Sequence, residues 1–193
     1  MLQRRTILQA FAAAAAGAAL VPAASLTSAE AAEATKTKKA IVIVFSRTGS
    51  TEKLARWIAE ETGADFLKLE LVDPYADDYG AMTNIAREER TSGKRREIKT
   101  TIPDLSGYDM VWLGSPYWWG GYSVPMLTFL RDHPLESKRV HPFCVSASSS
   151  PDGAWSDLAK LCPKAERSEG FWVRERGVDG AREALAAWIR KNR

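Results

Sequence analysis

Residues 40–51 constrain the fold of this chain more than any other stretch. Their sequence is AIVIVFSRTGST, in which a short apolar run at 41–45 is followed directly by a turn rich in hydroxyl side chains. The apolar run is too brief for a buried helix and is rich in β-branched residues, so it predicts a strand covered on both faces. Residues 52–62 then carry apolar side chains at helical spacing. The stretch therefore predicts a central strand, a tight turn and a helix in direct succession.

The turn between this strand and helix has the chemistry of a phosphate site. Backbone N–H groups at a helix start are unpaired and lie at the positive end of the helix dipole, so they bind anions. The turn lacks both the GxxxxGK[ST] pattern of nucleoside-triphosphate loops and the GxGxxG pattern of dinucleotide folds, which favours a monophosphate. The alternative is a capped helix start without a ligand, because Ser and Thr are common caps. The candidate residues are Ser46, Arg47, Thr48, Gly49, Ser50 and Thr51.

The order of residues in this turn resembles the phosphate loop of the flavodoxins, S/T-x-T-G-x-T. The resemblance implies a flavin mononucleotide (FMN) whose phosphate lies in residues 46–51. Residues 73–82, DPYADDYGAM, also resemble the corresponding stretch of a flavodoxin-like subfamily. This second match supports the family and assigns no chemistry.

The N-terminal 31 residues have the layout of an export signal. Arg4 and Arg5 precede an alanine-rich apolar stretch, and residues 29–31 offer a small-residue cleavage site. The paired arginines resemble the recognition motif of the twin-arginine route. We therefore expect a periplasmic protein with a signal peptide at 1–31 and no stable membrane insertion after cleavage. The alternative is an uncleaved anchor, although the run is short and alanine is weakly hydrophobic.

Behind this leader we expect a short linker at 32–39 and one domain at 40–193, a normal size for a full core. Outside the leader the chain has 25 Lys and Arg against 23 Asp and Glu. So balanced a charge argues against a nucleic-acid binder, which needs a clustered basic face. It also departs from the strongly acidic electron-transfer flavodoxins, whose charge steers them to basic partners.

The cysteines and histidines are few. Cys144 and Cys162 are the only cysteines, and with His133 and His141 they form no metal set. A buried free thiol is the prediction for Cys144, while an oxidising compartment leaves a disulfide with Cys162 open. We expect both histidines to be structural or surface residues. The sequence therefore predicts neither a metal ligand nor a catalytic side chain.

A second candidate loop follows the predicted strand 110–114. Residues 115–121, SPYWWGG, place three aromatics between a proline and two glycines, where we expect the strand to end and the chain to reverse. Aromatic side chains stack well on flat rings such as isoalloxazine. The resemblance assigns stacking to Trp118 or Trp119 and a peptide contact with flavin N5 to Gly120. The alternative is that the aromatics fill the core or a homodimer interface. The candidates are Pro116, Tyr117, Trp118, Trp119 and Gly120.

A third candidate loop, ASSSPDG at 147–153, follows the predicted strand 140–146. Its small residues let the backbone approach a ligand closely. It resembles the second flavin-edge loop of the family, whose amides would bind the pyrimidine end of the ring and stabilise its reduced form. Serines replace the aromatic that often covers the outer flavin face here, so we expect one open face. The candidates are Ser146, Ser148, Ser149, Ser150 and Gly153.

The remaining pattern alternates strand and helix. This alternation predicts an α/β fold with a parallel sheet and right-handed crossovers. The resemblance implies a flavodoxin-like three-layer sandwich with a five-stranded parallel sheet in the order 2-1-3-4-5, in which the three candidate loops converge at the carboxyl edge. We also expect an edge strand at 65–71, a last strand at 171–174, a solvated charged loop at 91–99, and helices at 81–90, 124–131, 155–161 and 180–190, the last capped by Asp179.

These features predict an FMN-binding redox protein. The first hypothesis is an exported FMN-dependent oxidoreductase that passes electrons or hydride to a quinone-like or other small acceptor, with the redox chemistry supplied by the cofactor. The alternative is a non-enzymatic electron-transfer protein whose partner is another redox protein. A flavin-free remnant that uses the fold as a binding scaffold is the third hypothesis.

Overall fold

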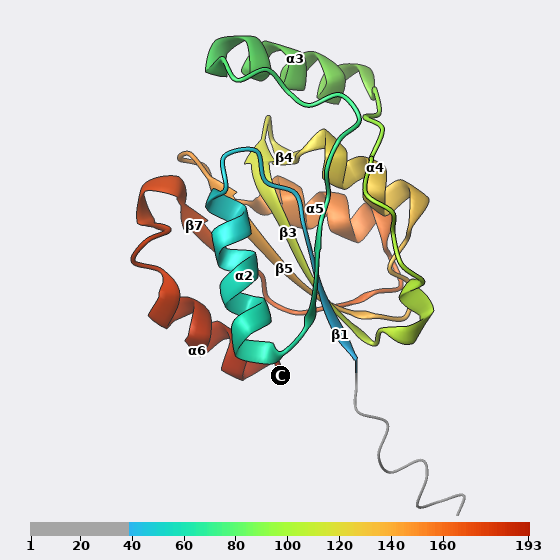
Figure 1. The fold of residues 1–193 in the computed structure, drawn as a ribbon, viewed down its shortest axis with the longest axis vertical. Helices are drawn as coiled ribbons and strands as arrows, with labels where there is room; N and C mark the ends of the chain where they lie inside the picture. The colour runs from blue at the N-terminus through green and yellow to red at the C-terminus, as the bar shows by residue number, and fades with distance from the viewer. Residues whose placement is uncertain (1–38) are drawn as a thin grey trace, which may run out of the picture. The chain divides into compact units, whose positions relative to one another are not determined.

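Parallel strands form the centre of the fold (Figure 1). The structure is a computed structural model that describes residues 39–193. The predicted signal peptide at 1–31 and the linker up to residue 38 lie outside the described residues. Lys39 already belongs to the folded part, because its backbone carbonyl accepts hydrogen bonds from the N–H groups of Asp109 and Met110.

The sheet contains the predicted strands in the order β2-β1-β3-β5, and β7 pairs in parallel with β5. The α/β fold and this strand order are confirmed. Two additional two-residue strands were not predicted: β4(Gly121–Tyr122) runs antiparallel to β3, and β6(Glu166–Arg167) pairs with the start of β5. The last position of the sheet is therefore shared by β6 and β7. The five principal strands are β1(Ala40–Val44), β2(Asp65–Lys68), β3(Met110–Trp118), β5(Arg139–Ser146) and β7(Phe171–Arg174).

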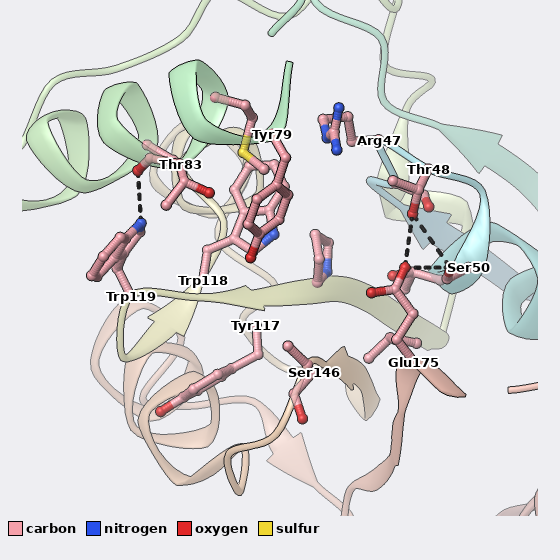
Figure 2. A pocket seen from close by; sticks show the side chains of 17 residues that line it. Arg47, Thr48, Ser50, Tyr79, Thr83, Tyr117, Trp118, Trp119, Ser146 and Glu175 are labelled. Carbon is pink, nitrogen blue, oxygen red and sulfur yellow. Dashed lines mark hydrogen bonds between the residues drawn. The ribbon is translucent and has the colours of Figure 1, made fainter. Parts of the chain in front are cut away.

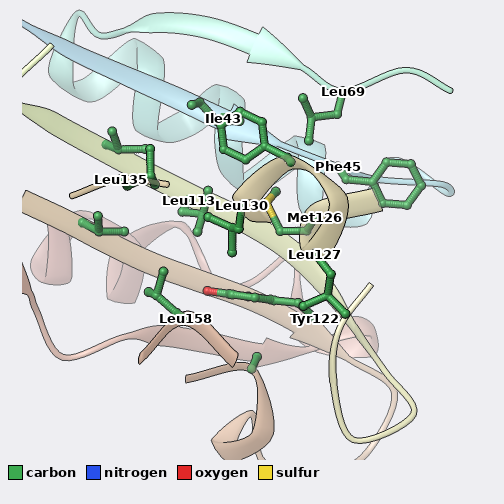
Figure 3. Close-up of a cluster of buried hydrophobic side chains, with 14 of the residues drawn as sticks. Ile43, Phe45, Leu69, Leu113, Tyr122, Met126, Leu127, Leu130, Leu135 and Leu158 are labelled. Carbon is green, nitrogen blue, oxygen red and sulfur yellow. The ribbon is translucent and has the colours of Figure 1, made fainter. Parts of the chain in front are cut away.

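Helices cover both faces of the sheet and bury its apolar side chains in two clusters. On one face, α2(Ser50–Thr62) and α6(Arg182–Asn192) pack Leu54, Ile58 and Leu185 against the sheet. The second face carries the cluster that Figure 3 shows, with Leu113, Met126 and Leu158 among its members. Each fully buried aliphatic side chain of this kind stabilises the fold by about 1.5–3 kcal/mol. The helices of this second face are α4(Val124–Asp132) and α5(Asp152–Leu161). Helix α3(Tyr79–Ser92) lies beyond the ends of the strands and adds Met82 and Ala86 to the same cluster (Figure 1).

Of the two helix ends for which a terminating or capping residue was predicted, one is correct and one is wrong. Helix α2 ends at Gly63, which adopts the left-handed conformation with φ 69° and closes the last turn, as expected. The prediction that Asp179 caps the last helix is wrong, because α6 begins after Ala181. The Asp179 carboxylate instead pairs with Lys53 of α2 at 2.6 Å. Asp179 thus lies two residues before the N-cap position, which Ala181 holds.

The charged segment 91–99 is not a wholly solvated loop. Arg96 is largely buried, and its Nε donates to the carboxylate of the buried Glu89 at 2.9 Å. The hydroxyl of Tyr75 donates to the other oxygen of that carboxylate at 2.6 Å. Burial and this hydrogen bond raise the pKa of Tyr75. The three side chains fasten α3 to the segments on either side of it, and α3 forms one wall of the candidate site.

The cysteines and histidines have structural positions. Cys144 and Cys162 are both free and buried, as predicted for Cys144. Burial also lowers the pKa of His141 to about 4, and the positive charge of Arg139 adds to this effect. His133 stacks on the ring of Phe129. Among residues 39–193 no group of side chains could hold a metal ion, and no helix has the length and apolar character needed to cross a membrane.

Candidate functional site

A cleft opens at the edge of the sheet where β1, β3 and β5 end (Figure 2). Its volume of about 250 Å³ is too large for a packing defect, since a water molecule takes up about 30 Å³. The ends of β3 and β5 and the residues that follow β1, β3 and β5 supply most of the lining, and the first turns of α3 form a further wall. The predicted residues that line the cleft are Ser46, Arg47, Thr48, Ser50, Thr51, Pro116, Tyr117, Trp118, Trp119 and Ser146.

The turn after β1, residues 46–51, is called the hydroxyl turn below. Gly49 adopts φ 91°, a conformation that favours glycine, and its N–H donates to Ser46 Oγ at 3.1 Å. Helix α2 starts at the next residue, so its unpaired N–H groups and positive dipole end lie at this turn. The side chain of Thr48 is exposed and that of Ser50 is half-buried, and both line the cleft.

A carboxylate side chain of the protein itself contacts the hydroxyl turn. The Glu175 carboxylate accepts hydrogen bonds from Ser50 Oγ at 3.0 Å and from Thr48 Oγ1 at 3.4 Å. Glu175 belongs to the 3₁₀ turn η2(Glu175–Gly177), which directly follows β7. The parallel strand β7 ends at the same edge of the sheet as β1, β3 and β5. Because the turn holds a carboxylate through its hydroxyls, its donor set suits a phosphate group as well.

Arg47 connects the hydroxyl turn to the segment before α3 and forms no ion pair with Glu175. One of its terminal nitrogens donates to the carbonyls of Ala76 and Asp77, at 3.4 and 3.2 Å, and thus links the hydroxyl turn to the segment that leads into α3. Its Nε is buried and has no hydrogen-bond partner among the described residues. A buried donor of this kind is a further group that a polar ligand could satisfy.

The aromatic segment departs from the sequence prediction in one respect. We expected the third strand to stop at Gly114, but β3 continues to Trp118. The short strand β4 supplies partners for Tyr117 and Trp118 and so extends the pairing. The chain reverses at Trp119 and Gly120, within the stretch 115–121 where the reversal was expected, and these residues have φ values of 50° and 88°.

The three aromatics point in different directions (Figure 2). Trp118 is half-buried and packs edge-on against Tyr75 and Phe45, with ring centroids 5.2 and 5.8 Å apart. Trp119 lies at the rim, 45% exposed, and its Nε1–H donates to the Thr83 carbonyl of α3 at 2.9 Å. Both tryptophans predicted to stack line the cleft, and Tyr117 lines it as well.

An ion pair beside the cleft holds the reversal of the chain in place. The Arg90 guanidinium of α3 donates to the carbonyls of Trp119 and Tyr122, both at 3.0 Å. Its remaining nitrogen pairs with the Asp157 carboxylate of α5 at 2.9 Å, which in turn accepts from the Tyr122 N–H. Both charged side chains are less than one-fifth exposed. We call these two residues the Arg90–Asp157 clamp.

Of the third candidate loop only its first residue, Ala147, lines the cleft, together with Ser146 at the end of β5. Ser148 and Ser149 lie outside the lining, and Ser150 lines a separate cavity beside α5. Gly153 is the second residue of α5, and a Cβ atom there would lie 1.8 Å from the Gly120 carbonyl oxygen. Gly153 therefore lets α5 approach the chain reversal and does not itself line the cleft. Gly49 and Gly120 contribute backbone conformation and are likewise not lining residues.

Sequence reasoning missed three kinds of lining residue. The first comes from α3, where Tyr79 is 66% exposed at the cleft mouth, and the stretch 73–82 carried only a family resemblance. The second is Glu175, whose position after a parallel strand was the only indication. The third is the pair that flanks the predicted Ser146 at the end of β5. The missed residues are Tyr79, Met82, Thr83, Ala86, Val145, Ala147 and Glu175.

The arrangement offers anion-binding donors at one end of the cleft and aromatic surface at the other. The histidines and cysteines lie outside the cleft lining. The cleft is therefore suited to hold a flat ring that carries an anionic tail.

Comparisons with known proteins agree with this geometry. The family model described as Flavodoxin matches residues 39–192. No curated protein matches the chain. A proposed flavoprotein from Bacteroides uniformis ATCC 8492 shares 25% identity over 79% of this chain and 98% of its own, with a TM-score of 0.69.

Two further solved structures have similar folds. A proposed flavoprotein from Bacteroides eggerthii DSM 20697 is 28% identical over 77% of this chain and 98% of its own, with a TM-score of 0.64. A flavoprotein from Lactobacillus acidophilus NCFM, solved in complex with FMN, is 24% identical over 74% of this chain and 97% of its own, with a TM-score of 0.62.

The Arg90–Asp157 clamp yields a prediction about the chain reversal. Arg90→Met removes the donor to backbone carbonyls and leaves the Asp157 carboxylate without its cation. We expect a loss of about 1.5–3 kcal/mol in the free energy of unfolding, measured by urea denaturation, and faster amide hydrogen exchange at Tyr122.

Arg87→Met is the matched control for this prediction. Arg87 lies one turn earlier on α3, is exposed, and its guanidinium lies over the Trp119 ring at 5.3 Å. The control should change stability by less than about 0.5 kcal/mol. Equal effects of the two substitutions would contradict a specific role for the clamp.

Proposed function

Because the chain belongs to the flavodoxin family, we propose that the cleft binds FMN and that the protein is a flavin-dependent redox protein. The observation that carries this proposal is the convergence of the hydroxyl turn, the aromatic segment and the start of the β5–α5 loop in one cleft. The FMN complex of the similar Lactobacillus acidophilus flavoprotein supports the choice of ligand.

The residues of the cleft fit FMN by their chemistry. The hydroxyls of Thr48 and Ser50, together with the start of α2, would hold the phosphate, as their contact with the Glu175 carboxylate supports. Aromatic surface for the ring comes from Tyr79, Trp118 and Trp119. The backbone at Ala147 would meet the edge of the ring. FMN, when bound, supplies the redox chemistry itself, and the protein orients it and sets its electrostatic surroundings.

The phosphate assignment can be tested at the hydroxyl turn. The double variant Thr48→Val, Ser50→Ala removes two hydroxyl donors and should weaken FMN binding by about 1–3 kcal/mol, the scale of lost hydrogen bonds to a charged group. Flavin fluorescence during titration of the apoprotein measures the Kd. Thr62→Val at the opposite end of α2 is the control and should leave the Kd unchanged. An unchanged Kd in the double variant would mean that the phosphate binds elsewhere.

Within this function we favour an oxidoreductase that acts on a quinone-like or other small acceptor. The wall formed by Ser146 and Ala147 carries no aromatic side chain, and Tyr79 and Trp119 at the opposite rim are exposed. A planar small molecule could therefore reach a ring bound in the cleft. The near-neutral charge also lacks the acidic excess that steers a carrier to a basic partner protein.

Turnover separates this hypothesis from a non-enzymatic electron carrier. The FMN-loaded protein should be reduced by NADH or NADPH under anaerobic conditions and should reduce a soluble quinone over many cycles. A protein that stays oxidised with both nucleotides, and that passes electrons only to a redox partner protein after chemical reduction, would instead be a carrier. A colourless protein that cannot be reconstituted with FMN would contradict both functions.

We also propose that the protein is exported to the periplasm by the twin-arginine route. Arg4, Arg5 and the alanine-rich stretch after them support this proposal. Exchange of both arginines for lysine should retain the protein in the cytoplasm of fractionated cells, whereas Lys38→Arg, an equally conservative change in the linker, should not. Export of the double variant at the normal level would contradict the route.

A further inference from the structure

The hydroxyl turn is occupied by a carboxylate of the protein itself. Glu175 follows β7, while the hydroxyls that it contacts, on Thr48 and Ser50, lie more than a hundred residues earlier in the chain. We propose that Glu175 is an internal competitor for the phosphate of the ligand, and that it sets the affinity of the cleft for phosphate-bearing flavins. This inference rests on the proposed binding of FMN.

The competition follows from the number of donors. Each hydroxyl has one proton to donate, so Thr48 and Ser50 cannot donate to a carboxylate and to a phosphate at the same time. A carboxylate that stayed in place would also repel the phosphate, because two like charges a few ångströms apart raise each other's energy. Binding of the phosphate therefore requires that Glu175 leave the hydroxyl turn.

The position of Glu175 permits such a movement. The residue is exposed and lies on a short 3₁₀ turn, so its side chain can swing toward water without disturbing the core. In the absence of ligand its carboxylate satisfies the two hydroxyls and balances the positive end of α2. The residue thus stabilises the ligand-free form and lowers the net affinity for the phosphate.

An ordinary charge contact at a helix start does not account for this arrangement. Helix α2 already has an acidic residue in its first turn, Glu52, whose carboxylate pairs with Arg56 at 2.6 Å and Lys68 at 2.7 Å. Glu175 makes its contacts to the hydroxyls of Thr48 and Ser50, which line the cleft. It lies where a ligand's anion would bind, whereas Glu52 does not line the cleft.

The test compares ligands with and without a phosphate. FMN and riboflavin are titrated into the apoproteins of the wild type, Glu175→Gln and Glu175→Ala, with flavin fluorescence as the readout. We expect both substitutions to lower the Kd for FMN about tenfold and to leave the Kd for riboflavin unchanged within about twofold. Glu183→Gln, which removes an exposed carboxylate from the first turn of α6, is the control and should change neither.

A second measurement avoids the flavin altogether. The amide resonances of Thr48, Gly49, Ser50 and Thr51 are followed by NMR as inorganic phosphate is added, with chloride at matched ionic strength as the reference. The Glu175→Ala protein should show saturable shifts at a lower phosphate concentration than the wild type. This NMR titration tests whether Glu175 competes with phosphate, and its result does not depend on how the ring of FMN binds.

Three results would overturn the inference. An unchanged FMN Kd in both variants would show that Glu175 does not compete. A weaker Kd for both ligands would mean that Glu175 contacts the ligand favourably. Tighter FMN binding by Glu175→Gln alone would assign the gain to the new amide donor. A different result would separate the two proposals. If none of the proteins bound FMN, but Glu175→Ala still responded to less phosphate than the wild type, FMN would be the wrong ligand and the competition by Glu175 would stand.

Discussion

The site depends on the register of three adjacent parallel strands. Val44 of β1 lies opposite Gly114 of β3, and Gly114 lies opposite Phe143 of β5. Only a glycine fits in the middle, because a Cβ atom at residue 114 would lie 2.2 Å from the Phe143 ring. Because the strands are held in this register, all three end at the same edge of the sheet. The hydroxyl turn, the aromatic segment and Ala147 are therefore brought together by backbone pairing before any ligand contributes.

Two ionic networks then fix α3 over this edge. The Arg90–Asp157 clamp joins α3 to α5 and holds carbonyls of the chain reversal, while Arg96 and Glu89 join α3 to the segment that follows it. Trp119 has φ 50°, a conformation that costs a residue with a side chain about 1–2 kcal/mol. The charge-assisted hydrogen bond from Arg90 to its carbonyl offsets a cost of this size. Burying charged groups adds little net stability on average, so the main contribution of these pairs is a defined position for the wall of the cleft.

Sequence patterns revealed the parts of the molecule that local chemistry determines. The apolar run before the hydroxyl turn, the glycine that ends α2 and the alternation of strand and helix each depend on neighbouring residues, and each was predicted correctly. The parts that were missed depend on partners distant in the chain. Pairing with β4 extends β3 beyond Gly114, Asp179 pairs with Lys53 of α2, and Arg96 is buried against Glu89. For the same reason the sequence could not place Glu175 at the hydroxyl turn, although it did identify ten of the residues that line the cleft.

Charges of both signs surround the hydroxyl turn. The donors on the turn are neutral hydroxyls and backbone N–H groups, and the Arg47 guanidinium is engaged by the carbonyls of Ala76 and Asp77. Lys53, one turn into α2, is paired with Asp179. The positive end of the helix dipole amounts to about half an elementary charge, and the Glu175 carboxylate carries a full negative charge of its own. Once Glu175 had left, a phosphate at this turn would gain the hydrogen bonds and the attraction of the Arg47 charge, which the neutral carbonyls do not cancel. The aromatic surface of Tyr79, Trp118 and Trp119 would offer further contacts to a bound ring.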